Sequence, residues 1–152
     1  MLIDIVKTHN QKNRKVVIYT SYKDKRIDDF IKYIHHFDNQ IIGYYREEKI
    51  FINLVDIFNF YTSDKKVYAT TSDGNYQIKM RMYELEEFLD YYFIRVSNTD
   101  IVNTYHIQSF KREGIKTVCV VLKSGCKIYV SRRYWPSVKK RMEDLAHEKT
   151  KD

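Results

Sequence analysis

The chain has 152 residues, of which 43% are hydrophobic and 15% aromatic, and this apolar content excludes extended disorder. Its 14 Tyr and 8 Phe suit pleated sheets, so the composition predicts a β-rich fold. The formal net charge of +7 indicates a polyanionic partner.

The N-terminal stretch indicates two strands, over residues 2–6 and 15–19, from the alternation of polar and apolar residues. Met1 leads directly into this alternation, so no signal peptide is expected. No apolar run approaches the roughly 18 residues of a membrane span. We therefore expect a cytoplasmic protein with reduced thiols.

A helix is predicted next, over residues 24–34, where the apolar side chains recur at helical spacing. Two strands, residues 41–46 and 49–54, follow around the pair Glu47-Glu48. Residues 1–46 are therefore interpreted as a small β-β-α-β unit for dimerisation or for contact with a partner, and residues 47–152 as a second domain.

From residue 56 onwards, short strands and turn signals recur at intervals of roughly 8 to 12 residues, which is typical of an all-β domain. The pairs Asp73-Gly74 and Ser124-Gly125 mark two of the turns, since glycine adopts the positive φ that tight turns need. The predicted strands are residues 58–60, 66–71, 76–80, 116–122 and 127–130. Short amphipathic helices are predicted over residues 82–91 and 135–147.

The positive charge is concentrated near the C-terminal end of the chain. Residues 111–141 contain ten basic residues and one acid, Glu113, so this stretch carries +9 and the remainder −2. Such a concentration favours nucleic-acid binding. The open alternative is a charged surface strip that is solvated and has no partner.

Cys119 lies shortly before the predicted turn that leads to Cys126. It is interpreted as a small buried hydrophobe in preference to a redox or metal-binding residue.

Residues 93–103, FIRVSNTDIVN, precede Ile107, the pair Lys111-Arg112 and the sequence VSRR at residues 130–133. In this order and spacing, the segments resemble the signature of the LytTR DNA-binding domains of bacterial response regulators. Further upstream matches are Asp56-Ile57, Asp73-Gly74 and the helix at residues 83–89. The resemblance covers roughly residues 47 to 145, about two thirds of the chain.

The resemblance implies a mainly β fold, α+β overall, made of an elongated domain of three small antiparallel sheets with short helices. It also implies that loops, and not a recognition helix, contact successive stretches of major groove. Carried over to this sequence, the contacts fall on the turn at residues 63–66 with Lys65 and Lys66, on Asn98, and on Arg133.

The chemistry of these side chains agrees with the resemblance. Arg133 can present two donors to guanine, and Asn98 can pair with adenine. Phosphate contacts, which position a protein without reading sequence, are expected from nearby hydroxyl and cationic groups. These groups are Ser97, Thr99, Arg132, Lys139 and Lys140.

Other interpretations remain open for several residues. Arg95 either contacts a phosphate or forms an internal ion pair with Asp100 or Glu87. Asn98 alone would suit the N-cap of a following short helix. Asn103 is expected to satisfy buried backbone groups and not to touch DNA.

No catalytic motif, cofactor or metal site is predicted, and adjacent residues such as His35 and His36 face different sides of a helix. About 45 residues precede the resemblance, too few for a phosphorylatable receiver domain of about 120 residues. The chain resembles stand-alone regulators, some of which are controlled by a membrane protein. We expect a homodimer on direct repeats of double-stranded DNA. The alternatives are an RNA or single-strand binder and a protein-interaction module with a basic surface.

Overall fold

The computed structural model describes residues 17–22 and 25–150. Its helices, including two short 3-10 helices, are α1 (Lys25–Asp38), η1 (Leu54–Asp56), α2 (Met82–Phe88), η2 (Thr104–His106) and α3 (Trp135–Thr150). Its strands are β1 (Gln40–Tyr45), β2 (Glu48–Asn53), β3 (Asn59–Ser63), β4 (Lys66–Thr71), β5 (Gly74–Ile78), β6 (Phe93–Arg95), β7 (Asp100–Asn103), β8 (Ile107–Glu113), β9 (Thr117–Leu122) and β10 (Lys127–Val130).

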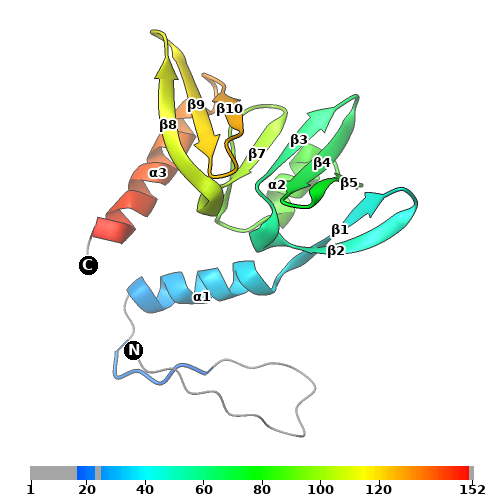
Figure 1. Ribbon diagram of the computed structural model, residues 1–152. Coiled ribbons are helices and arrows are strands. Elements are labelled where there is room, and N and C mark those ends of the chain that lie inside the picture. The colour runs from blue at the N-terminus through cyan, green and yellow to red at the C-terminus, as the bar shows by residue number, and fades with distance from the viewer. Residues whose placement is uncertain (1–16, 23–24, 151–152) are drawn as a thin grey trace, which may run out of the picture.

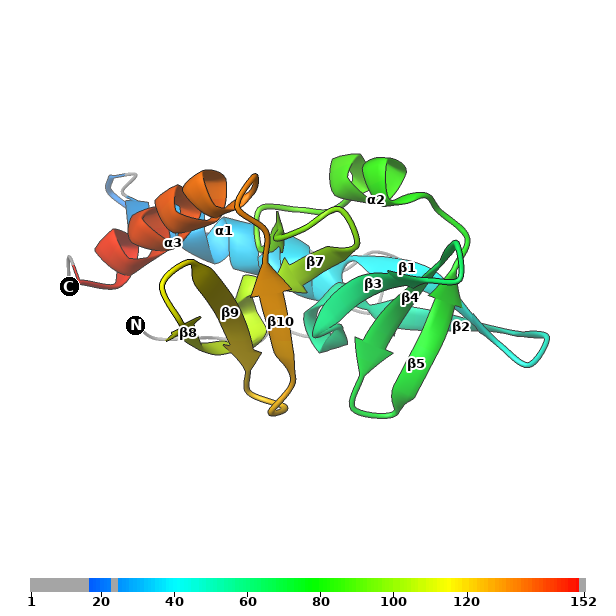
Figure 2. The same ribbon diagram turned by 90° about the horizontal axis from the view of Figure 1, so that it is seen from above.

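The strands form two antiparallel sheets. One has seven strands in the order β2-β1-β5-β4-β3-β7-β6, and the other has three in the order β10-β9-β8. Figure 1 shows the two sheets side by side, with α3 next to the smaller sheet and α1 below both. Figure 2 shows the same arrangement from above, with α2 beside the larger sheet.

Strands β6 and β7 lie between two hydrophobic cores. Phe93 and Ile101 belong to the core of the larger sheet, which also includes Phe60 and Leu85. Ile94 and Val102 belong to the core under the smaller sheet and α3. Successive residues of a strand point to opposite faces, so each strand contributes to both cores. The turn between β6 and β7 is therefore anchored by strands that pack into both cores.

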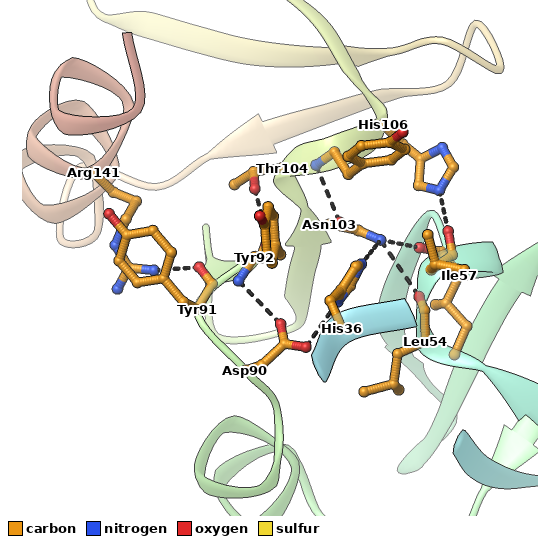
Figure 3. A network of polar contacts seen from close by, with 12 residues as sticks. His36, Leu54, Ile57, Asp90, Tyr91, Tyr92, Asn103, Thr104, His106 and Arg141 are labelled. Carbon is orange, nitrogen blue, oxygen red and sulfur yellow. Dashed lines mark hydrogen bonds and ion pairs between the residues drawn. The ribbon is translucent and has the colours of Figure 1, made fainter. Parts of the chain in front are cut away.

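Helix α1 is attached to the rest of the molecule by a buried polar network, shown in Figure 3. His36 is 0% exposed, and its Nδ1 lies 2.8 Å from Oδ2 of Asp90. Its ring also packs against those of Tyr92 and Phe93, at centroid distances of 4.7 and 5.3 Å. Because a buried polar group is stable only when its hydrogen bonds are made, this network fixes where α1 docks.

Asn103 connects the network to the larger sheet and to η2. Its Nδ2 donates to the backbone oxygen of Ile57 at 2.9 Å, and its Oδ1 accepts from the backbone N–H of Tyr105 at 3.1 Å. These bonds fix the orientation of the amide, whose Nδ2 also lies 3.3 Å from Nε2 of His36. Nε2 is therefore the acceptor, and Nδ1 carries the proton donated to Asp90. The prediction that Asn103 satisfies buried backbone groups is confirmed.

Most predicted elements are confirmed, including the helix found as α1 and the mainly β fold class. Of the strand predicted at residues 15–19, the structure describes residues 17–19. These residues have no regular secondary structure. The strand predicted at residues 2–6 lies outside the described residues. The boundary predicted between residues 46 and 47 falls in the turn of the β1–β2 hairpin.

The described residues contain two sheets, whereas three were expected. The β1–β2 hairpin joins the larger sheet through a single register pair, Tyr44 with Gln77. β3 pairs with β7 as well as with β4, which adds β6 and β7 to the same sheet. The number of sheets is lower than expected because two pairings, β1 with β5 and β3 with β7, join neighbouring hairpins into one sheet. Among the described residues, no helix is long and apolar enough to cross a membrane.

Candidate nucleic-acid interface

Three turns carry most of the predicted DNA-contacting residues. The first turn (residues 63–66) joins β3 to β4, the second turn (residues 96–99) joins β6 to β7, and the third turn (residues 131–134) joins β10 to α3. In Figure 1 the ends of these elements lie on the upper side of the molecule, away from α1. The arrangement gives one side of the molecule three protruding segments of backbone.

The first turn is a two-residue hairpin connection with positive φ at both central positions, 49° at Asp64 and 63° at Lys65. This geometry matches the right-handed twist of the flanking strands. It leaves Lys65 and the following Lys66 exposed to solvent. Both predicted cations of this turn are therefore accessible to a partner.

The second turn is held by the guanidinium of Arg95. Nε of Arg95 donates to the backbone oxygen of Ser97 at 3.0 Å, and Nη2 donates to that of Asn98 at 2.7 Å. Nη1 forms an ion pair with Oε2 of Glu86 at 2.8 Å. The internal ion pair considered for Arg95 is thus present, but its partner is Glu86 and not Asp100 or Glu87.

The hydroxyl groups of the second turn are also engaged within the turn. Ser97 Oγ and Thr99 Oγ1 donate to Oδ2 of Asp100 at 2.9 and 2.6 Å. Asn98 stands between these residues and is exposed. The interpretation of Asn98 as the N-cap of a following helix is wrong, because β7 follows and the next helical turn, η2, is capped by Asn103.

The third turn lies against the second. The backbone N–H of Ser131 donates to the backbone oxygen of Val96 at 2.8 Å. Tyr134 Oη donates to Oδ1 of Asn98 at 3.3 Å. The guanidinium carbon of Arg133 lies 5.6 Å from the centroid of the Tyr134 ring, and that of Arg95 lies 5.7 Å from it. Tyr134 therefore brings Asn98 and Arg133 to the same side of the molecule.

Tyr134 is not among the site residues predicted from the sequence. The phenol is half-buried, and its hydroxyl reaches a residue 36 positions earlier in the chain. Its position next to Arg133 was the available signal, since an aromatic ring adjacent to a guanidinium often stacks with it.

The first turn lies next to the second through strand pairing. The backbone N–H of Thr62 donates to the backbone oxygen of Thr99 at 2.9 Å, and Tyr61 pairs with Asp100. The three turns thus follow one another in the order first, second, third. The first turn carries the exposed cations Lys65 and Lys66, the third turn carries Arg132 and Arg133, and Lys139 and Lys140 are exposed on α3.

Two carboxylates lie close to these cations: Asp64, exposed in the first turn, and Glu143 on α3. Lys139 lies 4.0 Å from Glu143 one helical turn away, but both side chains are about 60% exposed, so the pair contributes little. Arg95 is mostly buried, with a side-chain exposure of 14%, and its donors face the second turn and Glu86. The three turns therefore expose the amide of Asn98 and several cationic side chains to solvent.

Residues 47–143 match the family described as the LytTr DNA-binding domain. Two relatives from different strains of Staphylococcus aureus are each named as an uncharacterized HTH-type transcriptional regulator. One is 31% identical over 144 residues, covering 93% of this chain and 98% of the relative. The other is 33% identical over 127 residues, covering 82% and 86%.

A solved LytTr DNA-binding domain from Bacillus cereus has the same fold. It superposes with a TM-score of 0.66 at 22% sequence identity, covering 69% of this chain and 97% of that domain. The family match extends over most of the chain, and its relatives align along nearly their whole length. The chain therefore belongs to the LytTR DNA-binding domain family.

Proposed function

We propose that this protein is a transcription regulator that binds double-stranded DNA sequence-specifically and reads the major groove with its three turns. The observation that supports this most directly is the contact of Tyr134 with Asn98 beside Arg133. It holds two side chains suited to reading bases next to each other, on a side rich in exposed cations. The described helices are separated by strands, so the proposed reading elements are turns and not a helix-turn-helix.

Arg133 is the residue proposed to read guanine, because its planar guanidinium offers two parallel donors to O6 and N7. Its position over the Tyr134 ring restricts the conformations of the side chain before DNA binds. Such pre-organisation reduces the conformational entropy that binding would otherwise cost.

Asn98 is the residue proposed to read adenine, which requires its amide oxygen to accept and its NH2 to donate. Tyr134 Oη occupies one of the two lone pairs of Oδ1, at 3.3 Å. The second lone pair and the NH2 group remain for a base. Tyr134 would therefore orient the amide of Asn98 without blocking its use.

The remaining predicted residues are proposed to bind phosphates or to support the turns. Five cationic side chains are exposed and can reach the DNA backbone: the two lysines of the first turn, Arg132, Lys139 and Lys140. Ser97 and Thr99 already donate to Asp100, so their backbone position matters more than their hydroxyl groups. Arg95 is proposed to act by holding the second turn.

The N-terminal part is proposed to serve dimerisation on direct repeats, or contact with a regulatory membrane protein. β2 is an edge strand of the larger sheet. Phe51 on β2 is 68% exposed and pairs with Ile42 on β1, which is 40% exposed. An exposed apolar pair across an edge strand and its neighbour suits contact with another chain. A Phe51→Lys variant that fills a two-site duplex as cooperatively as the wild-type chain, measured by sedimentation, would exclude this surface as the dimer contact.

The proposal is tested by selecting bound duplexes from a random pool and measuring affinity by fluorescence anisotropy over a range of salt. Affinity should fall steeply with salt, with a log–log slope of about −0.9 for each phosphate contacted. Arg133→Ala should cost about 1–3 kcal/mol on the selected duplex and lose the preference at one base pair.

Lys139→Ala is the matched control, since it also removes one cation but should weaken selected and random duplexes alike. Equal losses for Arg133→Ala on both duplexes would contradict base reading. Competition as effective by double-stranded RNA or oligo(dT) as by duplex DNA would instead favour the RNA or single-strand alternative.

A further inference from the structure

A hollow of about 350 Å³ lies at one end of the smaller sheet, beside the first residues of α3. Three cationic side chains line it, those of Arg112 on β8, Lys116 at the hairpin tip and Arg132 on the third turn. Half-buried Val118 and Trp135 also line it. The hollow is therefore lined by apolar side chains together with three positively charged ones.

No acidic side chain compensates these charges within the described residues. The residues that line the hollow include no Asp or Glu. Glu113, the single acid of this basic stretch, accepts from Lys127 Nζ at 3.0 Å and from Tyr129 Oη at 3.1 Å. Those hydrogen bonds lower the pKa of Glu113 and keep it on the other face of the sheet, since adjacent residues of a strand face opposite sides. The hollow is left as a site for an anion.

The hollow is continuous with the third turn. Arg132 lines the hollow and is followed directly by Arg133, the proposed base-reading residue. Val118 on β9 pairs with Val130, the last residue before the third turn. Figure 1 shows the β8–β9 hairpin rising on the same side of the molecule as the three turns. A duplex lying along the three turns would therefore extend towards this hairpin.

The tip of the hairpin carries a large apolar side chain in an exposed position. Ile115 is 96% exposed and lies between Lys116 and Gly114, whose φ of 76° forms the turn. A single exposed hydrophobic residue is ordinary on most surfaces. At the tip of a cationic hairpin it resembles the apolar residues with which minor-groove proteins contact sugars and base steps.

We propose that the β8–β9 hairpin is a fourth DNA-contacting element. The hollow holds a backbone phosphate just outside the stretch of major groove that the third turn reads. Ile115 packs against deoxyribose groups of the adjacent minor groove. This inference rests on the proposed function, because it places the duplex along the three turns.

The test uses the full chain and the duplexes selected from the random pool, with affinity measured by anisotropy at several salt concentrations. Arg112→Ala should make the log–log salt slope shallower by about 0.9, the value for one lost phosphate contact. Lys111→Ala is the matched control, because Lys111 is the exposed neighbour with the same charge on the opposite face of β8. It should leave the slope unchanged.

Ile115→Ser should weaken binding without changing the salt slope, because it removes an apolar contact and no charge. Hydroxyl-radical footprinting adds an independent readout of the sugars. The wild-type chain should protect a stretch of minor groove beside the bases read by Arg133, and the double variant Arg112→Ala, Ile115→Ser should lose that protection alone.

Equal changes in slope for Arg112→Ala and Lys111→Ala, or a footprint unchanged in the double variant, would overturn the role of the hairpin. In that case Arg133→Ala would still lose its base preference if the proposed function holds. A wild-type chain that binds no duplex more tightly than random DNA would overturn both.

Discussion

On the side that docks α1, polar side chains are buried and bonded to one another. His36 and Asn103 are both 0% exposed and lie 3.3 Å apart, and Asp90 completes the chain of contacts. On the side of the three turns, Asn98 and Arg133 are exposed, and the nearest contacts of Asn98 leave part of its amide to solvent. On the α1 side, hydrogen bonds between buried polar groups define one packing arrangement. On the side of the three turns, the polar groups are accessible to a partner.

The difference has an energetic cause. A buried polar group that loses its partner keeps its desolvation cost, whereas an exposed one exchanges the partner for water. Substitutions on the α1 side should therefore act mainly on the free energy of unfolding, and those on the turn side mainly on DNA affinity. Four predictions test that separation.

The largest effect is expected for His36→Ala, which removes a buried ring and deprives Asp90 and Asn103 of a partner each. The free energy of unfolding should fall by about 2–4 kcal/mol, as measured by urea denaturation. His35→Ala is the control, since His35 is the exposed neighbour on the same helix, and should change stability by less than about 0.5 kcal/mol. A loss of base preference in folded His36→Ala would break the proposed separation of the two sides.

Local patterns predicted the β9–β10 hairpin. β10 alternates exposed and buried residues after a glycine turn, and β9 is an apolar segment with two consecutive buried residues, so strand pattern and turn chemistry agree. β6 and β7 were recognised only as part of a family motif, because three and four residues are too few to show a period. The burial of His36 depends on Asp90 and Asn103, which lie 54 and 67 positions away, and no local pattern reports such contacts.

The candidate interface was predictable in part for the same reason. Asn98 and Arg133 were identified from the family resemblance, and their side chains are exposed on one side. Their connection through Tyr134 is a tertiary contact and was missed. The partners predicted for Arg95, Asp100 or Glu87, were both wrong. Glu86 and Glu87 point to different sides of α2, and sequence alone does not fix the rotation of that helix.

The next largest effect concerns Arg95, which is proposed to support the second turn and not to touch DNA. Arg95→Ala removes two bonds to backbone oxygens, so the turn should loosen and DNA affinity should fall by on the order of 1–2 kcal/mol. The salt slope should stay unchanged, because no phosphate contact is lost.

Two further variants sharpen this result. Arg95→Lys should not restore affinity, since an ammonium group cannot reproduce the planar fork of donors. Glu86→Ala, which removes an ion pair whose carboxylate is 50% exposed, should change affinity little. A slope shallower by about 0.9 in Arg95→Ala would instead identify Arg95 as a phosphate contact.

Smaller effects on stability and DNA affinity are expected for substitutions in two turns that have the same geometry but lie in different parts of the molecule. Lys65 in the first turn and Glu47 in the β1–β2 turn have φ of 63° and 68°. Glycine accepts this conformation without the cost that other residues incur, so Lys65→Gly and Glu47→Gly should each raise stability by about 0.5–1 kcal/mol. Lys65→Gly should also weaken DNA binding and its salt dependence, while Glu47→Gly should not. Equal DNA affinities for the two variants would remove Lys65 from the interface.

The smallest expected effect is a pH dependence of the free energy of unfolding, caused by His106 on the α1 side of the molecule. Burial lowers the pKa of His106, aided by the charge of Lys123, although the hydrogen bond from its Nε2 to the backbone oxygen of Val55 opposes the shift. Below the ordinary histidine pKa of about 6.5, the unfolded chain therefore binds a proton that the folded chain does not. Stability should fall as pH decreases from about 7 and should level off below the folded pKa of His106. In urea titrations between about pH 5 and 7.5, His106→Gln should show a shallower pH dependence than the wild-type chain. The base preference proposed for Arg133 should be the same for both proteins across this range, because His106 contacts η1 and Phe58, which lie outside the three turns.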